Sequence, residues 1–89
     1  MDIVHDTHAH QFSVAVEGHR GVIDYTLRNG VMLITHTEVP PAIGGRGIAA
    51  ELMRAALDTA RREGWKVLPA CSYAAAFIRR HPEFSDLLS

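Results

Sequence analysis

The first 40 residues contain three runs that predict β-strands: residues 10–17, 21–28 and 31–39. The first two runs alternate between apolar and polar positions with a period of two, and the third is mostly β-branched or apolar. A turn at Gly18-His19 separates the first two runs. Asn29-Gly30 separates the second from the third and is typical of a type I′ hairpin turn. Pro40-Pro41 cannot continue a hydrogen-bond ladder, so the first half predicts a three-stranded antiparallel meander.

After Pro41 the apolar spacing changes from a strand period to a helix period. One side of the predicted helix is charged and the other is an apolar stripe of Ile48, Ala49, Leu52, Met53, Ala56, Leu57 and Ala60. Gly64 is placed to end this helix as its C-terminal cap. Residues 65–69 then predict a short strand, and residues 72–80 a second helix that His81-Pro82 ends.

A strand, a helix and a second strand in this order form a right-handed crossover, which makes the two strands parallel. The predicted fold class is therefore α/β (α+β-like), with a mixed, mostly antiparallel sheet, one crossover helix and a C-terminal helix. Residues 1–89 are expected to form a single domain with one core. Phe84, Leu87 and Leu88 are expected to pack against the body of that domain.

Charge and cysteine content narrow the function classes. A formal net charge of −1 gives no general electrostatic reason to bind nucleic acid or an acidic membrane. No apolar run approaches the length of a membrane-spanning helix, and the N-terminus lacks a secretion-signal pattern. The single cysteine, Cys71, cannot form an internal disulfide, which fits a reducing, cytoplasmic location. His5, His8 and His10 lie with Asp6 in a segment expected to be a mobile end, where no metal site is expected.

Three glycines stand within four positions between the third strand and the first helix, at Gly44, Gly45 and Gly47. Without side chains, these residues let a phosphate approach the backbone amides closely. The N-terminus of the following helix adds a partial positive charge, and Arg46 is a candidate for a full one. The loop therefore predicts an anion site, although a tight strand-to-helix turn would also use glycine.

Two common phosphate-binding motifs do not fit this loop. Gly45-x-Gly47-x-x-Ala50 formally matches the dinucleotide fingerprint of the Rossmann fold. However, residues 65–70, where that fold holds the ribose, contain no carboxylate. A Walker A loop would need Gly-Lys-Ser or Gly-Lys-Thr, which this loop lacks.

The segment from Glu38 to Leu52 joins a strand exit, the loop Ile-Gly-Gly-Arg-Gly-Ile-Ala and an amphipathic helix. It resembles the GNAT superfamily of acyl-CoA-dependent N-acyltransferases. With residues 36–40, Pro69-x-Cys71-Ser72-Tyr73 and His81-Pro82-Glu83-Phe84 added, almost the whole chain resembles the small single-domain GNAT-like acetyltransferases. This resemblance implies a minimal GNAT-like fold and acetyl-CoA as the co-substrate.

The resemblance also implies where CoA binds. The glycine loop would hold the pyrophosphate, and the backbone around Glu38 and Val39 would pair with the pantetheine arm where two strands splay apart. The chain departs from the superfamily at Ala42, where Gln or Arg is usual, so the amides and Arg46 are left to hold the anion. The expected cofactor contacts are Val39, Ile43, Gly44, Gly45, Arg46, Gly47, Ile48 and Ala49.

Acyl transfer to an amine requires a neutral amine, a stabilised oxyanion and protonation of the leaving thiolate. Glu38 and His36, two residues apart on one side of their strand, are candidates to relay the proton of the amine, although His36 would also suit a structural role. Cys71 precedes a helix N-terminus, which favours a thiolate, and is a candidate acid, a transient acyl carrier or a small buried hydrophobe. Tyr73 is the alternative acid by resemblance, or a packing aromatic.

The sequence thus predicts an acetyl-CoA-dependent N-acetyltransferase that moves an acetyl group to an unidentified amine by attack on the thioester. The two helices that usually build the acceptor wall have no room in the chain, so the acceptor side is expected to be open or completed by a partner. A non-catalytic CoA or acyl-CoA-binding module is the alternative, and a small interaction protein with a purely structural loop is a third. The chain is expected to act as a monomer or a homodimer.

Overall fold

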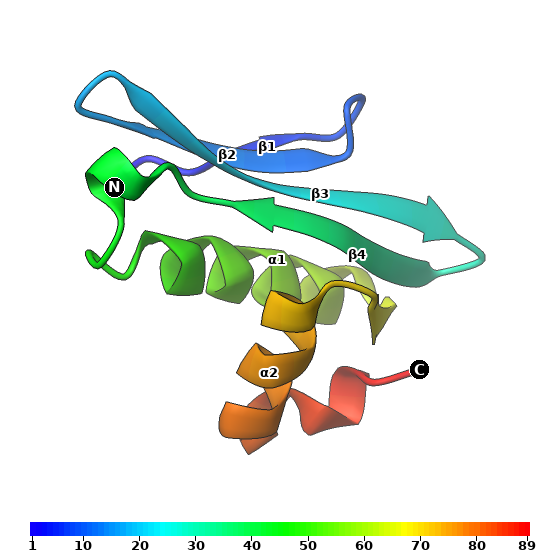
Figure 1. Ribbon diagram of the computed structural model, residues 1–89. Coiled ribbons are helices and arrows are strands. Elements are labelled where there is room, and N and C mark those ends of the chain that lie inside the picture. The colour runs from blue at the N-terminus through cyan, green and yellow to red at the C-terminus, as the bar shows by residue number, and fades with distance from the viewer.

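The computed structural model describes all 89 residues and contains one five-stranded sheet with strand order β1-β2-β3-β4-β5 (Figure 1). The first four strands pair antiparallel, and β4 pairs parallel with β5. The strands are β1 Val4–Asp6, β2 Gln11–Val16, β3 His19–Arg28, β4 Val31–Glu38 and β5 Lys66–Pro69.

Two α-helices and two 3₁₀ segments complete the fold: η1 Pro41–Ile43, α1 Ile48–Glu63, α2 Ser72–Arg80 and η2 Pro82–Leu87. In the view of Figure 1, helix α1 runs beneath the sheet, and α2 and the C-terminal segment lie below α1. The mixed, mostly antiparallel sheet with a crossover helix and a C-terminal helix confirms the predicted fold class. No helix of the chain is both long and apolar enough to cross a membrane.

The core lies between α1 and one face of the sheet. The apolar stripe of α1 is buried as its spacing predicts, apart from Ala49, which is only half-buried. The strands contribute Phe12, Ile23, Met32 and Ile34, each at most 1% exposed. Gly21 in β3 allows the helix to approach the sheet closely at its N-terminal end. A Cβ atom there would lie 3.3 Å from both Ile48 Cγ2 and Leu52 Cδ1. This close packing holds the start of α1 against the sheet, and the exposed glycine loop leads into this end of the helix.

The N-terminal segment corrects one expectation, because it is an ordered strand and not a mobile end. Strand β1 pairs with β2, and the ring of His5 stacks on Phe12 with centroids 4.0 Å apart. His5 Nε2 also lies 2.7 Å from the Tyr25 hydroxyl. These contacts tie a strand of only three residues to the core.

Two local expectations also change. The first hairpin turn is centred on Glu17 and Gly18, whose φ angles are 51° and 78°, so His19 already belongs to β3. At the C-terminus Phe84 and Leu87 are buried as predicted, but Leu88 is 43% exposed because its backbone, not its side chain, bridges to Val67 at the edge of β5.

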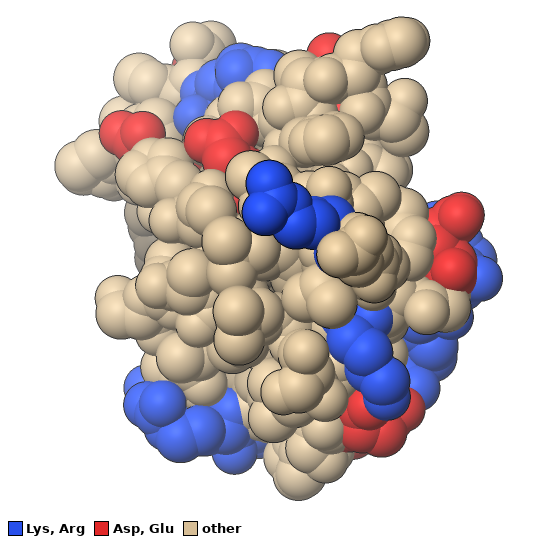
Figure 2. Space-filling view, turned by 90° about the vertical axis from the view of Figure 1, so that its right-hand side faces the viewer, with Lys and Arg blue, Asp and Glu red and all other residues tan.

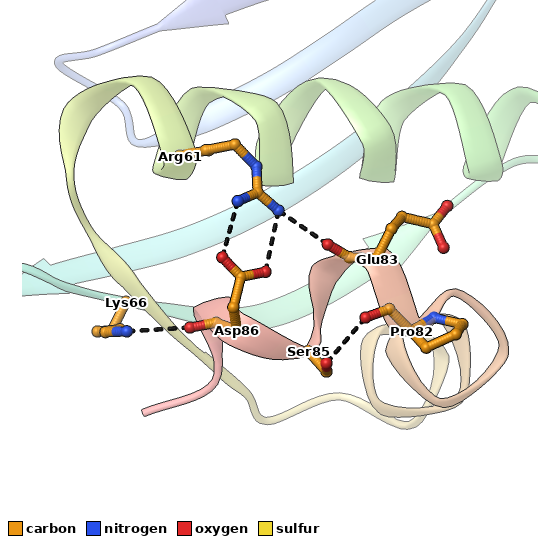
Figure 3. A network of polar contacts seen from close by, with 6 residues as sticks. All are labelled: Arg61, Lys66, Pro82, Glu83, Ser85 and Asp86. Atoms are coloured by element: carbon orange, nitrogen blue, oxygen red, sulfur yellow. Dashed lines mark hydrogen bonds and ion pairs between the residues drawn. The ribbon is translucent and has the colours of Figure 1, made fainter.

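Polar contacts fix the C-terminal segment against α1 (Figure 3). The Arg61 guanidinium donates to both carboxylate oxygens of Asp86, at 2.7 and 3.1 Å, and to the Glu83 carbonyl at 2.9 Å. Lys66 Nζ donates to the Asp86 carbonyl at 2.9 Å. On the face drawn in Figure 2, basic and acidic side chains are interspersed among neutral ones and form no single charged patch.

Candidate functional site

The glycine loop connects η1 to α1 at one end of the sheet. Gly45 and Gly47 have φ angles of 76° and 75°, in the left-handed region that favours glycine. Gly44 has a φ of −69°, and its amide donates to the Pro41 carbonyl at 3.1 Å. Gly44 therefore closes the 3₁₀ turn, whereas Gly45 and Gly47 shape the loop that follows it.

The amides that follow Gly44 are the chemically distinctive feature of this loop. The six consecutive N–H groups from Gly45 to Ala50 donate to no acceptor in the chain, and the first helical donor is the Glu51 amide, which bonds to the Gly47 carbonyl. Helix α1 also has no side-chain cap at its N-terminus. A helix start with unpaired amides and the positive end of the helix dipole is suited to an external anion.

Arg46, at the centre of the loop, is ion-paired with Glu17, a contact that the sequence did not predict. Its guanidinium makes two hydrogen bonds with the Glu17 carboxylate, at 2.7 and 3.0 Å. This hydrogen-bonded pair lowers the pKa of Glu17 and raises that of Arg46. Glu17 lies in the β2–β3 turn, which reaches the same end of the molecule as the loop (Figure 1). Only its charge was visible in the sequence, which placed it at the end of a predicted strand.

Strands β4 and β5 separate close to this loop. Their pairing ends at Ile34 and Pro69, whereas β4 continues to Glu38 along β3. The amides of Ala70 and Cys71 both donate to the Ile34 carbonyl, at 2.9 and 3.1 Å, and the two chains then diverge. The structure therefore contains the splay between these strands that the resemblance implied.

A β-bulge in β4 reverses the side-chain alternation of this strand at the splay. Asp24 pairs with His36 but the next residue, Tyr25, pairs with Ile34, so Thr35 is an extra residue in β4. Thr37 lies opposite the buried Ile23 and therefore shares the face that carries α1. His36 and Glu38 lie on the opposite face.

Two pairs of polar side chains meet near the splay. On the outer face His36 Nε2 lies 3.2 Å from Glu38 Oε1, and both side chains are more than half exposed. On the α1 face Thr37 Oγ1 lies 3.5 Å from Cys71 Sγ. Thr37 was not among the residues singled out from the sequence, because only the bulge turns it toward the cysteine.

Cys71 is the N-cap residue of α2. Its sulfur accepts a hydrogen bond from the Ala74 amide at 3.4 Å, and the residue is half-buried. Tyr73 lies in the first turn of the same helix, and its ring packs 6.1 Å from that of Phe77. Burial raises the pKa of Tyr73, while the charges of Arg80 and Arg54 act in the opposite direction. The protonated phenol of Tyr73 and the N-cap side chain of Cys71 therefore lie at the same end of α2.

With this geometry in place, comparison with known proteins identifies the class. The family model of the GCN5-related N-acetyltransferases matches residues 11–87, and the chain belongs to this family. It is a small GNAT-like acetyltransferase, as the sequence resemblance indicated.

Individual relatives agree with this assignment. Protein NATD1 of Mus musculus is 37% identical over 83 residues, which cover 90% of this chain and 76% of the relative. Protein NATD1 of Homo sapiens is 36% identical, with 90% and 74% covered. Among solved structures, the NMR solution structure of a GCN5-like protein from Staphylococcus aureus aligns with a TM-score of 0.79. It covers 99% of this chain and 87% of the other, at 23% identity, and so supports the fold alone.

Proposed function

We propose that the chain is an acetyl-CoA-dependent N-acetyltransferase that binds the CoA pyrophosphate on the glycine loop and transfers the acetyl group to an amine. The observation that carries this proposal is the run of unpaired amides from Gly45 to Ala50, beside the splay between β4 and β5. The loop supplies donors for a diphosphate without any side chain, which compensates for alanine at position 42. Family membership supports the transferase chemistry.

The proposed cofactor path follows the chain from the loop to the splay. The pyrophosphate would lie against Gly45, Arg46, Gly47, Ile48 and Ala49, with Gly44 and Ile43 forming the rigid turn beneath it. Beyond Ile34, β4 lacks a ladder partner on its β5 side. Its backbone near Glu38 and Val39 is therefore open to pair with the pantetheine amides, and the thioester would lie close to Thr37 and Cys71.

The base that deprotonates the amine and the acid that protonates the leaving thiolate are assigned to groups on opposite sides of the splay. Glu38, paired with His36, would take the proton of the attacking amine from the outer face, directly or through water. The amine nitrogen then bonds to the acetyl carbon, the carbon–sulfur bond of the thioester breaks, and the leaving CoA thiolate takes a proton. Cys71, which meets Thr37 at the splay, is the first candidate for this acid role, or it accepts the acetyl group transiently. Tyr73 is the alternative acid, since its raised pKa keeps the phenol protonated.

Thermal unfolding with and without acetyl-CoA, CoA and NAD tests the cofactor assignment. We expect both CoA species to raise the unfolding temperature and NAD to leave it unchanged, because a ligand that binds only the folded state stabilises it. Gly45→Asp and Gly45→Asn are a matched pair, since both residues tolerate a positive φ and they differ by one negative charge. Asp should abolish the CoA shift, whereas Asn should retain part of it.

Turnover then separates an enzyme from a binding module. No helix covers the outer face beside His36 and Glu38, since β1, β2 and β3 are joined only by turns. Such an open face suits an amine presented by a large partner, and it equally suits a CoA binder without efficient catalysis. Acetylation of amine-bearing peptides and polyamines by the parent supports the transferase, whereas binding of acetyl-CoA without any transfer supports the binding module.

A further inference from the structure

The chain contains two hairpin turns of the same type but with different residues at the first central position. Asn29 and Gly30 have φ angles of 51° and 75°, and Glu17 and Gly18 have 51° and 78°. Asparagine is favoured at the left-handed position because its short side chain tolerates that backbone, whereas glutamate is not. The turn at Glu17 therefore departs from local preference, and the side chain of Glu17 offers the reason.

That side chain reaches across 29 positions of sequence to Arg46 and holds its guanidinium with both carboxylate oxygens. Arg46 is the only charged residue between Glu38 and Glu51, so it is the only full charge carried by the glycine loop. A guanidinium presents the same planar pair of donors to a carboxylate as to a phosphate. The backbone amide of Arg46 is itself one of the unpaired donors, so an anion on the loop lies within reach of this side chain.

We propose that Glu17 competes with the bound phosphate for the Arg46 guanidinium and thereby sets the affinity and exchange of CoA. This inference rests on the proposed function. In the free protein Glu17 neutralises Arg46; when a phosphate binds to the amides, the guanidinium transfers from the carboxylate to the phosphate. No covalent bond changes in this exchange.

The exchange is energetically accessible because the ion pair is exposed. The side chains of Arg46 and Glu17 are 43% and 64% accessible, and exposed pairs stabilise a protein only weakly. After the exchange the Glu17 carboxylate is left without its partner near a bound anion, which favours release. Removal of the carboxylate should therefore tighten CoA binding by about two- to fivefold, the range that corresponds to an exposed pair.

The test titrates CoA into the parent, Glu17→Gln, Arg46→Gln and the double variant by calorimetry at one fixed ionic strength. Glu17→Gln keeps the size of the side chain, and Glu17→Asn removes the charge with a residue that suits the turn, so a folding defect is not a concern. We expect both Glu17 variants to bind CoA about two- to fivefold more tightly than the parent. Arg46→Gln should cost more affinity in the Glu17→Gln background than in the parent, because Arg46 is then fully available to the phosphate.

Unchanged or weaker CoA binding by both Glu17 variants overturns the inference, as does an equal cost of Arg46→Gln in both backgrounds. Either result leaves the proposed function intact as long as the parent binds CoA. Inorganic pyrophosphate is titrated in parallel. Failure of the parent and of Glu17→Gln to bind either CoA or pyrophosphate overturns the proposed function together with the inference.

Discussion

Thr37 Oγ1 and Cys71 Sγ lie 3.5 Å apart across the point where β4 and β5 diverge. The Ala74 amide donates to the same sulfur at 3.4 Å, so two polar groups contact it. This arrangement exists because the bulge at Thr35 places Thr37 on the α1 face of the sheet. In the proposed cofactor path, this contact places Cys71 beside a thioester that enters the splay.

Cys71→Ser should lower kcat for acetyl transfer by about 100-fold, the low end of what a positioned proton donor contributes, while CoA affinity stays at the parental level. Serine is a good N-cap, so the substitution should not lower the unfolding temperature. Steady-state kinetics and calorimetry on the same preparations check both parts. Parental turnover in Cys71→Ser would leave the sulfur with a structural role and transfer the acid role to Tyr73, for which Tyr73→Phe is the direct probe.

Two of the loop glycines, Gly44 and Gly47, should respond differently to alanine. Gly47→Ala should cost about 1–2 kcal/mol, because its φ of 75° is unfavourable for any residue with a Cβ. Gly44→Ala should stay within about 1 kcal/mol of the parent, since its φ is −69° and a Cβ there would lie 3.4 Å from the Pro41 carbonyl oxygen. Urea unfolding measures both. Equal destabilisation by the two substitutions would contradict the difference in backbone conformation between the two positions.

Gly21→Ala should destabilise the fold by about 1–3 kcal/mol, the usual cost of overpacking a core. The added methyl group would press on Ile48 and Leu52, at the N-terminal end of α1. Because this end of the helix also carries the proposed anion site, CoA affinity should fall with stability. Gly44→Ala is the control, and an unchanged unfolding midpoint for Gly21→Ala would contradict the close helix–sheet contact.

Stability should decrease in mildly acidic solution because of His5. Burial lowers the pKa of His5 below its usual 6.5, and the charge of Arg62 lowers it further. The unfolded state then binds a proton that the folded state does not, so the contribution of His5 is present above about pH 6.5 and is lost as the pH falls through the folded pKa. The free energy of unfolding of the parent and of His5→Phe, measured from neutral to mildly acidic pH, tests this contribution. His8→Phe, in the exposed turn, is the control. His5→Phe should show the flatter dependence; identical curves for parent and His5→Phe would refute the assignment.

Much of the fold could be predicted because its signals are local. The apolar stripe of α1 and the Asn29-Gly30 turn each depend on residues close in sequence, and both appear as expected. Strand β1 could not be predicted, because three residues rich in His and Asp have little strand preference of their own. Its order comes from the contact of His5 with Phe12 and Tyr25, which only the folded sheet brings together.

In the candidate site, too, features that depend on local sequence could be predicted and features that depend on tertiary contacts could not. The glycine loop and the positions of Cys71 and Tyr73 at a helix start follow from composition and spacing, so the sequence located them. The bulge at Thr35 leaves no mark in the apolar pattern, so Thr37 was missed. Glu17 was missed because its partner Arg46 is 29 residues away and the two meet only when the β2–β3 turn packs beside the loop.

We propose that the amides from Gly45 to Ala50 hold the CoA pyrophosphate. A ¹H–¹⁵N NMR titration of the protein with CoA, and with inorganic pyrophosphate as a second ligand, tests this assignment amide by amide. We expect the largest shifts for both ligands at the amides of Gly45–Ala50, and additional shifts near Thr37 and Cys71 with CoA alone. Saturable shifts that map elsewhere, or no shifts with CoA, would show that the glycine loop does not bind the pyrophosphate and serves only as a turn.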